Sequence, residues 1–130
     1  MRCRILLFAL LLSSFPLPLN GAEKNGEWLL TNGKAILRWM DSGYKESKSI
    51  ADDGVLSYIR GYRDALTWAG QTSKNSPVSI PVEVTSGQLV RVVVSYLEKH
   101  PEELHQHTSV LLWNAFVQAY PNPNFKPPKE

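Results

Sequence analysis

The stretch Ile80 to Leu104, IPVEVTSGQLVRVVVSYLEKHPEEL, carries the clearest helix start and stop signals in the chain. Thr85 and Gln88 have the spacing of a capping box, in which each side chain accepts a backbone N–H of the other residue. A basic last turn precedes Pro101, which is expected to end the helix. The apolar residues between these signals cover most of the helix circumference and leave one narrow polar stripe, formed by Gln88, Arg91, Ser95 and Glu98. The stretch therefore predicts a central, largely buried helix.

Residues 1–22 have the features of a secretory signal peptide. A short basic segment, Met1 to Arg4, is followed by the unbroken apolar run Ile5 to Leu12, and small residues precede a cut after Ala22. The apolar run is too short to span a bilayer. We therefore expect cleavage, export and no membrane anchor in the mature chain.

The mature chain is expected to be free of cysteine and close to neutral. Cys3, the one cysteine, leaves with the signal peptide, so neither a disulfide nor thiol chemistry is expected. Removal of Arg2 and Arg4 reduces 14 basic side chains to 12, against 12 acidic ones. This balance gives no electrostatic reason to expect nucleic acid or an anionic membrane as a partner.

Two helices are predicted before the central one. Asn25 can cap the first, which Asp41-Ser42-Gly43 would close with glycine just past the end. Asp52 or Asp53 is expected to cap the second, which would run to about Ala69. Its expected core face is formed by Val55, Ile59, Tyr62 and Leu66.

Gly61 lies in the middle of the second predicted helix, where glycine costs about 1 kcal/mol relative to alanine. We expect a neighbouring backbone or aromatic ring to pack against it. Arg60 and Asp64 have the spacing of a solvated surface ion pair.

A last helix is predicted to begin at Pro101 and to turn Leu104, Leu111, Leu112, Ala115 and Phe116 inward. Residues 121–130 are rich in proline and are expected to form an extended or disordered, flexible tail. The size of the chain allows one hydrophobic core. The predicted fold is therefore an all-α, small single-domain bundle of about four to five helices over residues 23–120.

The longest polar, non-periodic stretch is Gly70 to Ser79, which is predicted to be an exposed loop. It is the best candidate for a contact surface, and the alternative is a spacer loop with no partner. The candidate partner-binding residues are Gln71, Thr72, Ser73, Lys74, Asn75 and Ser76.

No residue pattern points to catalysis, a metal or a cofactor. His105 and His107 would lie about 200° apart on a helix and could not share an ion, and His100 is better explained as a helix-end residue. No serine stands in a nucleophile motif and no glycine-rich phosphate loop occurs. The four tryptophans are expected to pack in or beside the core. We therefore expect a protein that is not an enzyme and binds neither metal nor cofactor.

Several motifs follow one another over nearly all of the mature chain. The most specific block runs from Val84 to Glu102, and further motif residues are Leu29-Leu30, Tyr58-Ile59, Ala65, Ile80, Ala115 and Ala119-x-Pro121. In their order and spacing, these residues resemble the Rap/Tai family of type VI secretion immunity proteins. The residues that we take as the family's structural motif are Tyr58, Gly61, Asp64, Pro81, Thr85, Gln88, Tyr96, Leu97, His100 and Pro101.

This resemblance implies a small helical periplasmic protein, often a homodimer, that binds a cell-wall amidase effector and blocks its active site. Family members carry cysteines near the positions held here by Gly33, Val55, Ser79 and Asn122. A lost disulfide removes about 2–5 kcal/mol from a small secreted domain, so packing must compensate. Two rival hypotheses are a periplasmic stress or chaperone-like helical protein with no toxin partner, and an enzyme acting on cell-wall material.

Overall fold

The computed structural model describes residues 24–45, 50–73 and 75–127. Over these residues the chain forms four α-helices and one short 3-10 turn, and no β-strand. The elements are α1 (Gly26–Asp41), α2 (Ile50–Ser73), α3 (Ser86–Lys99), η1 (Pro101–Glu103) and α4 (Thr108–Ala119). The predicted all-α fold is confirmed. The predicted signal peptide lies outside the described residues.

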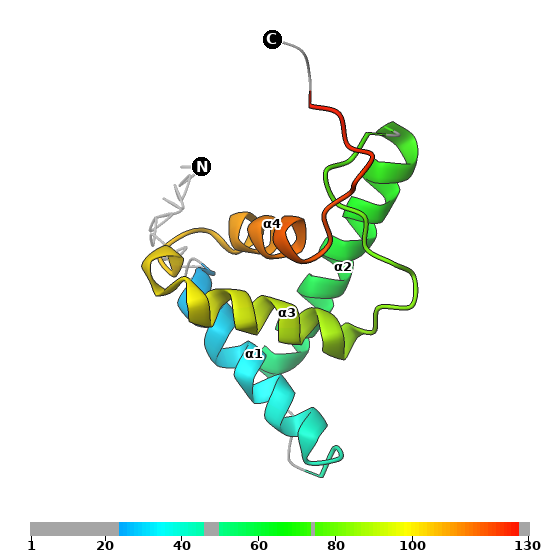
Figure 1. Cartoon of the computed structure of the whole chain (residues 1–130). Coiled ribbons are helices and arrows are strands. Elements are labelled where there is room, and N and C mark those ends of the chain that lie inside the picture. The colour runs from blue at the N-terminus through cyan, green and yellow to red at the C-terminus, as the bar shows by residue number, and fades with distance from the viewer. Residues whose placement is uncertain (1–23, 46–49, 74, 128–130) are drawn as a thin grey trace, which may run out of the picture.

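Helix α3 lies in the middle of the bundle and contacts each of the other three α-helices. In Figure 1, α1 crosses below it and α4 lies above it, while the longer α2 extends past them at one end. The core is formed mainly by aliphatic side chains from all four helices. Its fully buried larger members are Leu29, Ile36, Val55, Ile59, Leu89, Val90, Val93, Leu97, Leu111, Leu112 and Phe116.

Both predicted ends of the central helix are confirmed. The backbone N–H of Gln88 donates to the Thr85 hydroxyl oxygen at 3.3 Å, and the N–H of Thr85 donates to Oε1 of Gln88 at 2.7 Å. His100 caps the C-terminal end, and its N–H donates to the carbonyls of Tyr96 and Leu97. Local hydrogen bonding thus defines α3 as the sequence predicted.

The predicted ends of α1 are also confirmed. Asn25 accepts the N–H of Trp28 at 3.1 Å, and Gly43 follows the helix with φ +68°. The N–H of Tyr44 donates to the carbonyl of Trp39, and the two rings meet edge to face at 4.6 Å. This is a Schellman ending with its hydrophobic contact.

Helix α2 is longer at both ends than predicted. It begins at Ile50, so Asp52 and Asp53 lie inside its first turns and do not cap it. Acidic residues suit the first turn as well as the cap, which explains the error. At the other end it continues past Ala69 to Ser73, where the Thr72 hydroxyl donates to backbone carbonyls of the preceding turn.

The prediction of one last helix from Pro101 was wrong. Pro101 opens only the 3-10 turn η1, and α4 begins seven residues later at Thr108. The segment between η1 and α4 pairs with the chain around the start of α1. The N–H of Gly26 donates to the Leu104 carbonyl at 2.8 Å, and the N–H of Thr108 donates to the Lys24 carbonyl at 3.3 Å. These contacts between distant segments replace a continuous helix.

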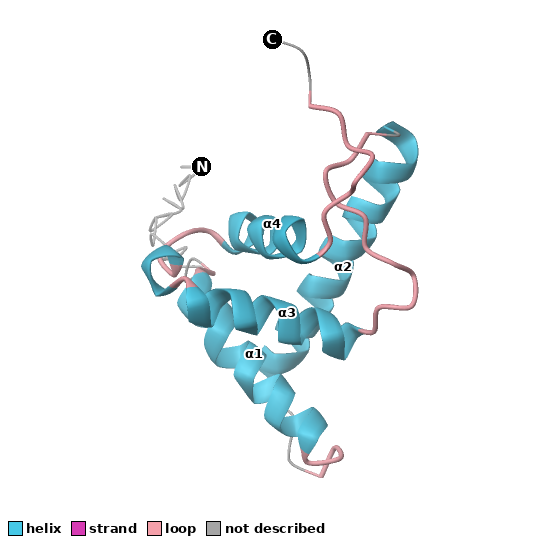
Figure 2. Ribbon diagram, in the orientation of Figure 1, coloured by secondary structure: helices cyan, strands magenta, loops and turns pink. Residues whose placement is uncertain are grey.

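Residues 121–127, which follow α4, form no helix and include a turn at residues 123–124. Figure 2 shows them beside the α2–α3 connection. The N–H of Asn122 donates to the Pro77 carbonyl at 3.0 Å, and its side chain donates to the Ser76 carbonyl at 2.7 Å. Asn75 and Lys126 exchange two further hydrogen bonds. The tail therefore helps to fix the α2–α3 connection.

Two of the helix-interior glycines, Gly33 in α1 and Gly61 in α2, have opposite surroundings. The expectation of a close neighbour at Gly61 was wrong, since a Cβ there would meet no atom within 4 Å. The close approach is at Gly33, where a Cβ would lie 2.8 Å from Cγ2 of Val94. Gly33 is buried and lets α1 pack closely against α3.

Two surface expectations also need correction. Arg60 donates to the Ser86 hydroxyl at 2.7 Å, and Asp64 pairs with Arg63, so the Arg60–Asp64 pair is not the observed arrangement. Trp68, which was expected to pack in or beside the core, is 68 % exposed.

In the described part of the chain, no helix is both long and apolar enough to cross a membrane.

Candidate functional site

Five of the six predicted contact residues are described, and they fall into two structural groups. Gln71, Thr72 and Ser73 form the last turn of α2 and are not in a loop. Asn75 and Ser76 lie in the α2–α3 connection and bond to the C-terminal segment, and Lys74 lies outside the described residues. Only part of the predicted contact loop is therefore a free surface.

The exposed end of α2 does present apolar surface. Trp68 is 68 % exposed, and Val82, in the segment that runs back past α2, is 85 % exposed. A shallow groove of about 270 Å³ separates this segment from α2. It is lined by Leu66, Thr67, Gly70, Gln71, Val78, Ser79, Ile80 and Val82. Gln71, one of the predicted contact residues, thus borders this groove.

The family motif residues have mainly structural roles. Tyr58 joins α2 to α4, since its hydroxyl oxygen lies 3.3 Å from the Thr108 hydroxyl, and Leu97 is fully buried. Pro81 is exposed and accepts the N–H of Val84, while Asp64 is exposed and paired. The structure does not bring these residues together into one site.

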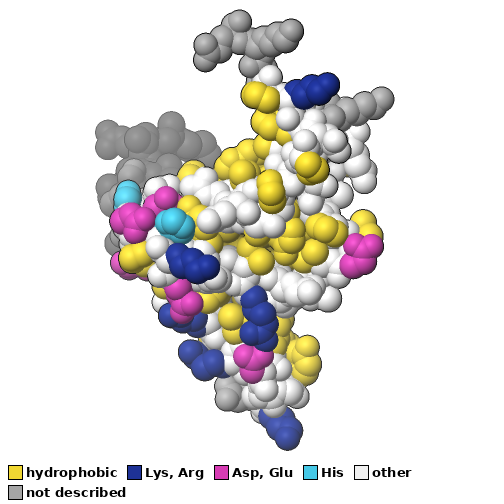
Figure 3. Space-filling model, viewed as in Figure 1, with side chains coloured by type: hydrophobic (Ala, Val, Ile, Leu, Met, Phe, Trp, Pro, Cys, Tyr) yellow, Lys and Arg dark blue, Asp and Glu magenta, His cyan; other side chains and the backbone are white. Residues whose placement is uncertain are grey.

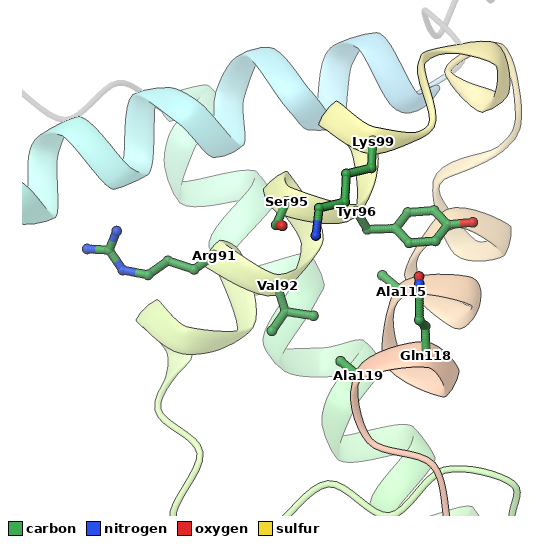
Figure 4. Close-up of a pocket in the computed structure, with 8 residues that line it drawn as sticks. All are labelled: Arg91, Val92, Ser95, Tyr96, Lys99, Ala115, Gln118 and Ala119. Carbon is green, nitrogen blue, oxygen red and sulfur yellow. The ribbon is translucent and has the colours of Figure 1, made fainter.

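A larger groove, which we call the α3–α4 groove, lies between α3 and α4 and has a volume of about 370 Å³. Figure 3 shows apolar side chains gathered over this region, with basic side chains beside them. Its lining is drawn in Figure 4 and comes from two helices: Arg91, Val92, Ser95, Tyr96 and Lys99 from α3, and Ala115, Gln118 and Ala119 from α4.

Tyr96, one of the lining residues, makes a polar contact through its hydroxyl. The Tyr96 hydroxyl donates to Oε2 of Glu103 at 2.7 Å, and the Tyr96 ring lies 4.4 Å from the His100 ring, centre to centre. Burial of the phenol, together with this hydrogen bond, raises the pKa of Tyr96 to about 12. Tyr96 is therefore a neutral, fixed wall of the groove at ordinary pH.

The charged members of the lining are both basic. Arg91 forms an ion pair with Asp41 at the end of α1. Lys99 is exposed and forms no ion pair with any other residue in the described ranges. Figure 4 shows the Lys99 side chain running along α3 towards Ser95. The groove thus has an apolar floor and a positively charged edge.

A group of possible metal-ligating side chains lies at the turn after α3. His100, Glu102 and Glu103 offer three possible ligand atoms within 4.8 Å of one another. The backbone N–H of Glu102 and the His100 side chain lower the pKa of Glu102, and Glu103 already accepts from Tyr96. Helix-end contacts thus account for these side chains, and we propose no metal site here. His107 is separate from the cluster and caps α4.

Sequence reasoning missed the α3–α4 groove, although part of its signal was present. Arg91 and Ser95 belong to the polar stripe of α3, but the stripe by itself does not show which helix lies beside it. Ala115 and Ala119 are one turn apart on α4, and their small side chains leave the hollow open. Only the packing of α4 beside α3 brings these residues together.

Comparison with known proteins gives one family. No curated protein and no solved structure matches the chain significantly. The model of the Rap1a immunity proteins matches residues 26–122, which extend from the first residue of α1 to just beyond α4. Because the match covers more than half of the chain and confirms the resemblance seen in the motifs, the chain belongs to the family of Rap1a immunity proteins.

Proposed function

We propose that this protein is a periplasmic immunity protein that binds a peptidoglycan amidase effector of type VI secretion and occludes its active site. The observation that carries the proposal is the family match over residues 26–122. The signal-peptide pattern of residues 1–22 supports the location, since a cell-wall amidase acts where this leader would deliver the protein.

Inhibition by this protein would act through binding and not through catalysis. The exposed end of α2 is one candidate contact, because Trp68 is exposed beside Gln71 and Thr72. Tryptophan is among the residues that contribute most to protein–protein affinity when a partner covers them. Asn75 and Ser76 are already bonded to the C-terminal segment, so we place the contact on the helical part of the predicted segment.

The test begins with the genes beside the coding sequence. An amidase-like gene found there is expressed with the mature protein, the two are co-purified, and the dissociation constant is measured by calorimetry. Hydrolysis of purified cell-wall sacculi is then followed with increasing immunity protein. We expect full inhibition at one immunity protein per amidase.

Amidase activity that persists at saturating immunity protein would overturn the occlusion mechanism, and absence of binding would overturn the proposed function. Trp68→Ala should weaken binding if the end of α2 makes contact. Trp113→Ala, which removes an exposed tryptophan from α4, is the matched control. The resemblance also predicts a homodimer, which sedimentation of the free protein tests.

A further inference from the structure

The α3–α4 groove has the dimensions of a site for a short extended peptide segment. Arg91, Ser95 and Lys99 follow one another at four-residue intervals along one face of α3. They span about 12 Å at the rise of an α-helix, which corresponds to about four residues of an extended chain. Across from them, Ala115 and Ala119 leave room for small side chains.

The electrostatics of the groove favour a negatively charged occupant. Its lining holds two cations and no carboxylate. The Arg91–Asp41 pair is exposed, with side chains 55 % and 58 % accessible, and exposed ion pairs contribute little to stability. Arg91 can therefore turn to another carboxylate at little cost. Glu103 is not part of the lining, and its carboxylate already accepts a hydrogen bond from the Tyr96 hydroxyl.

The hydrogen-bonding groups along the groove add a second recognition element. Ser95 and Gln118 lie on opposite sides of it, one on α3 and one on α4. A hydroxyl and a carboxamide can bond the N–H and carbonyl groups of an extended backbone. The described C-terminal segment does not fill the groove, because residues 121–127 bond to the α2–α3 connection.

We propose that the α3–α4 groove docks an extended surface segment of the amidase partner that carries an Asp or Glu, with its carboxylate at Lys99 and Arg91 and a small apolar side chain on Ala115 and Ala119. This proposal rests on the proposed function. It adds a second contact, separate from the end of α2, and assigns the chemistry of the partner segment that the contact recognises.

The first test uses the amidase complex and charge reversal. Lys99→Glu is expected to weaken amidase binding at least tenfold, and Ala119→Phe, which fills the groove, should do the same. The matched control is Lys126→Glu, which makes the same charge change. Lys126 uses only its backbone atoms in its two hydrogen bonds with the Asn75 side chain, so the substitution leaves both bonds possible. It should change the dissociation constant less than twofold.

Circular dichroism and thermal melting establish that each variant is folded before binding is measured. If the wild type binds the amidase and both groove variants bind it equally tightly, the groove proposal is overturned while the proposed function stands. If the wild type binds no amidase, the proposed function fails, and the groove is decided by a test that needs no amidase.

That second test titrates isotope-labelled protein with two capped tetrapeptides, acetyl-Ala-Asp-Ala-Glu-amide and its uncharged analogue acetyl-Ala-Asn-Ala-Gln-amide. The acidic peptide should shift the amide resonances of Arg91, Ser95, Lys99 and Gln118, and the analogue should shift them much less. Equal shifts with both peptides, or none, would overturn the charge recognition. A dimer that Ala119→Phe dissociates would show that a second copy covers the groove, and would also overturn the proposal.

Discussion

The phenolic hydroxyl of Tyr96 in α3 donates a hydrogen bond to Oε2 of Glu103 in η1, across 2.7 Å. This contact joins the end of the central helix to the turn that follows it, and the Tyr96 side chain also lines the α3–α4 groove. The side chain of Tyr96 is also buried against the core. One residue therefore contributes to packing, to the turn and to the groove wall.

Loss of this contact should change the alkaline stability of the protein. The pKa of Tyr96 is raised to about 12 in the folded state, mainly by burial and then by the Glu103 hydrogen bond, against about 10 in an unfolded chain. Its contribution to stability is complete below about pH 10 and is lost as the pH rises to about 12. Urea unfolding of the wild type and of Tyr96→Phe should therefore differ in the slope of stability between pH 9 and 12.

We expect Tyr96→Phe to be less stable at pH 8, by about 1 kcal/mol for the lost hydrogen bond, and to lose less stability on the way to pH 12. Burial also raises the pKa of Tyr62 and Tyr120, and these residues act equally in both proteins. Parallel curves for the two proteins would show that Tyr96 does not carry the effect. Tyr96→Ala should be more damaging at every pH, because it also leaves a cavity.

Alanine should have opposite effects at Gly61 and at Gly33, which both lie inside helices. Gly61→Ala should stabilise the protein by up to about 1 kcal/mol, because alanine has the higher helix propensity and its Cβ meets no neighbouring atom. Gly33→Ala should destabilise it, because the new Cβ would lie 2.8 Å from Val94 and β-branched side chains in helices have little freedom to move. Overpacking of this kind costs about 1–3 kcal/mol.

The melting temperatures of Gly33→Ala and Gly61→Ala are compared with that of the wild type. Each variant is the control of the other, because both add one methyl group. A stabilising Gly33→Ala would mean that α1 and α3 can move apart without loss. A destabilising Gly61→Ala would mean that a neighbour packs there in solution.

The capping box of α3 predicts a specific loss on removal of one hydroxyl. Thr85→Ala removes the oxygen that accepts the N–H of Gln88 and should cost about 1 kcal/mol. Thr85→Ser keeps that oxygen and should cost much less. Denaturant unfolding of the two variants measures the difference, and equal losses would assign the effect to the Thr85 methyl group.

His107 occupies the N-cap position of α4, where histidine is uncommon. Replacing it with a preferred N-cap residue should stabilise the helix. Nδ1 of His107 accepts the N–H of Ser109 at 3.3 Å, and this requires an unprotonated nitrogen. His107→Asp replaces it with a preferred capping residue whose negative charge suits the helix N-terminus, and should add up to about 1 kcal/mol at pH 7. His107→Ala is the control and should be less stable than the wild type. A loss of stability in the Asp variant would show that the imidazole has another role.

Local sequence signals predicted the helix ends that local hydrogen bonds determine. Asn25, Gly43, Thr85 and Gln88 act through groups only a few residues away, so their spacing in the sequence was sufficient to place them. The family motifs were also readable in the sequence, because they are defined by residue order. Fold class and family followed from these features.

Only the tertiary structure decided the features that depend on contacts between distant segments. Gly33 and Gly61 are both helix-interior glycines in the sequence, yet only Gly33 faces a neighbouring helix. Pairing of the start of α1 with the segment around Leu104 accompanies the break before α4. The C-terminal segment forms hydrogen bonds with Asn75 and Ser76, two of the predicted contact residues. The α3–α4 groove arises in the same way, because its walls come from separate helices that only packing of the core brings together.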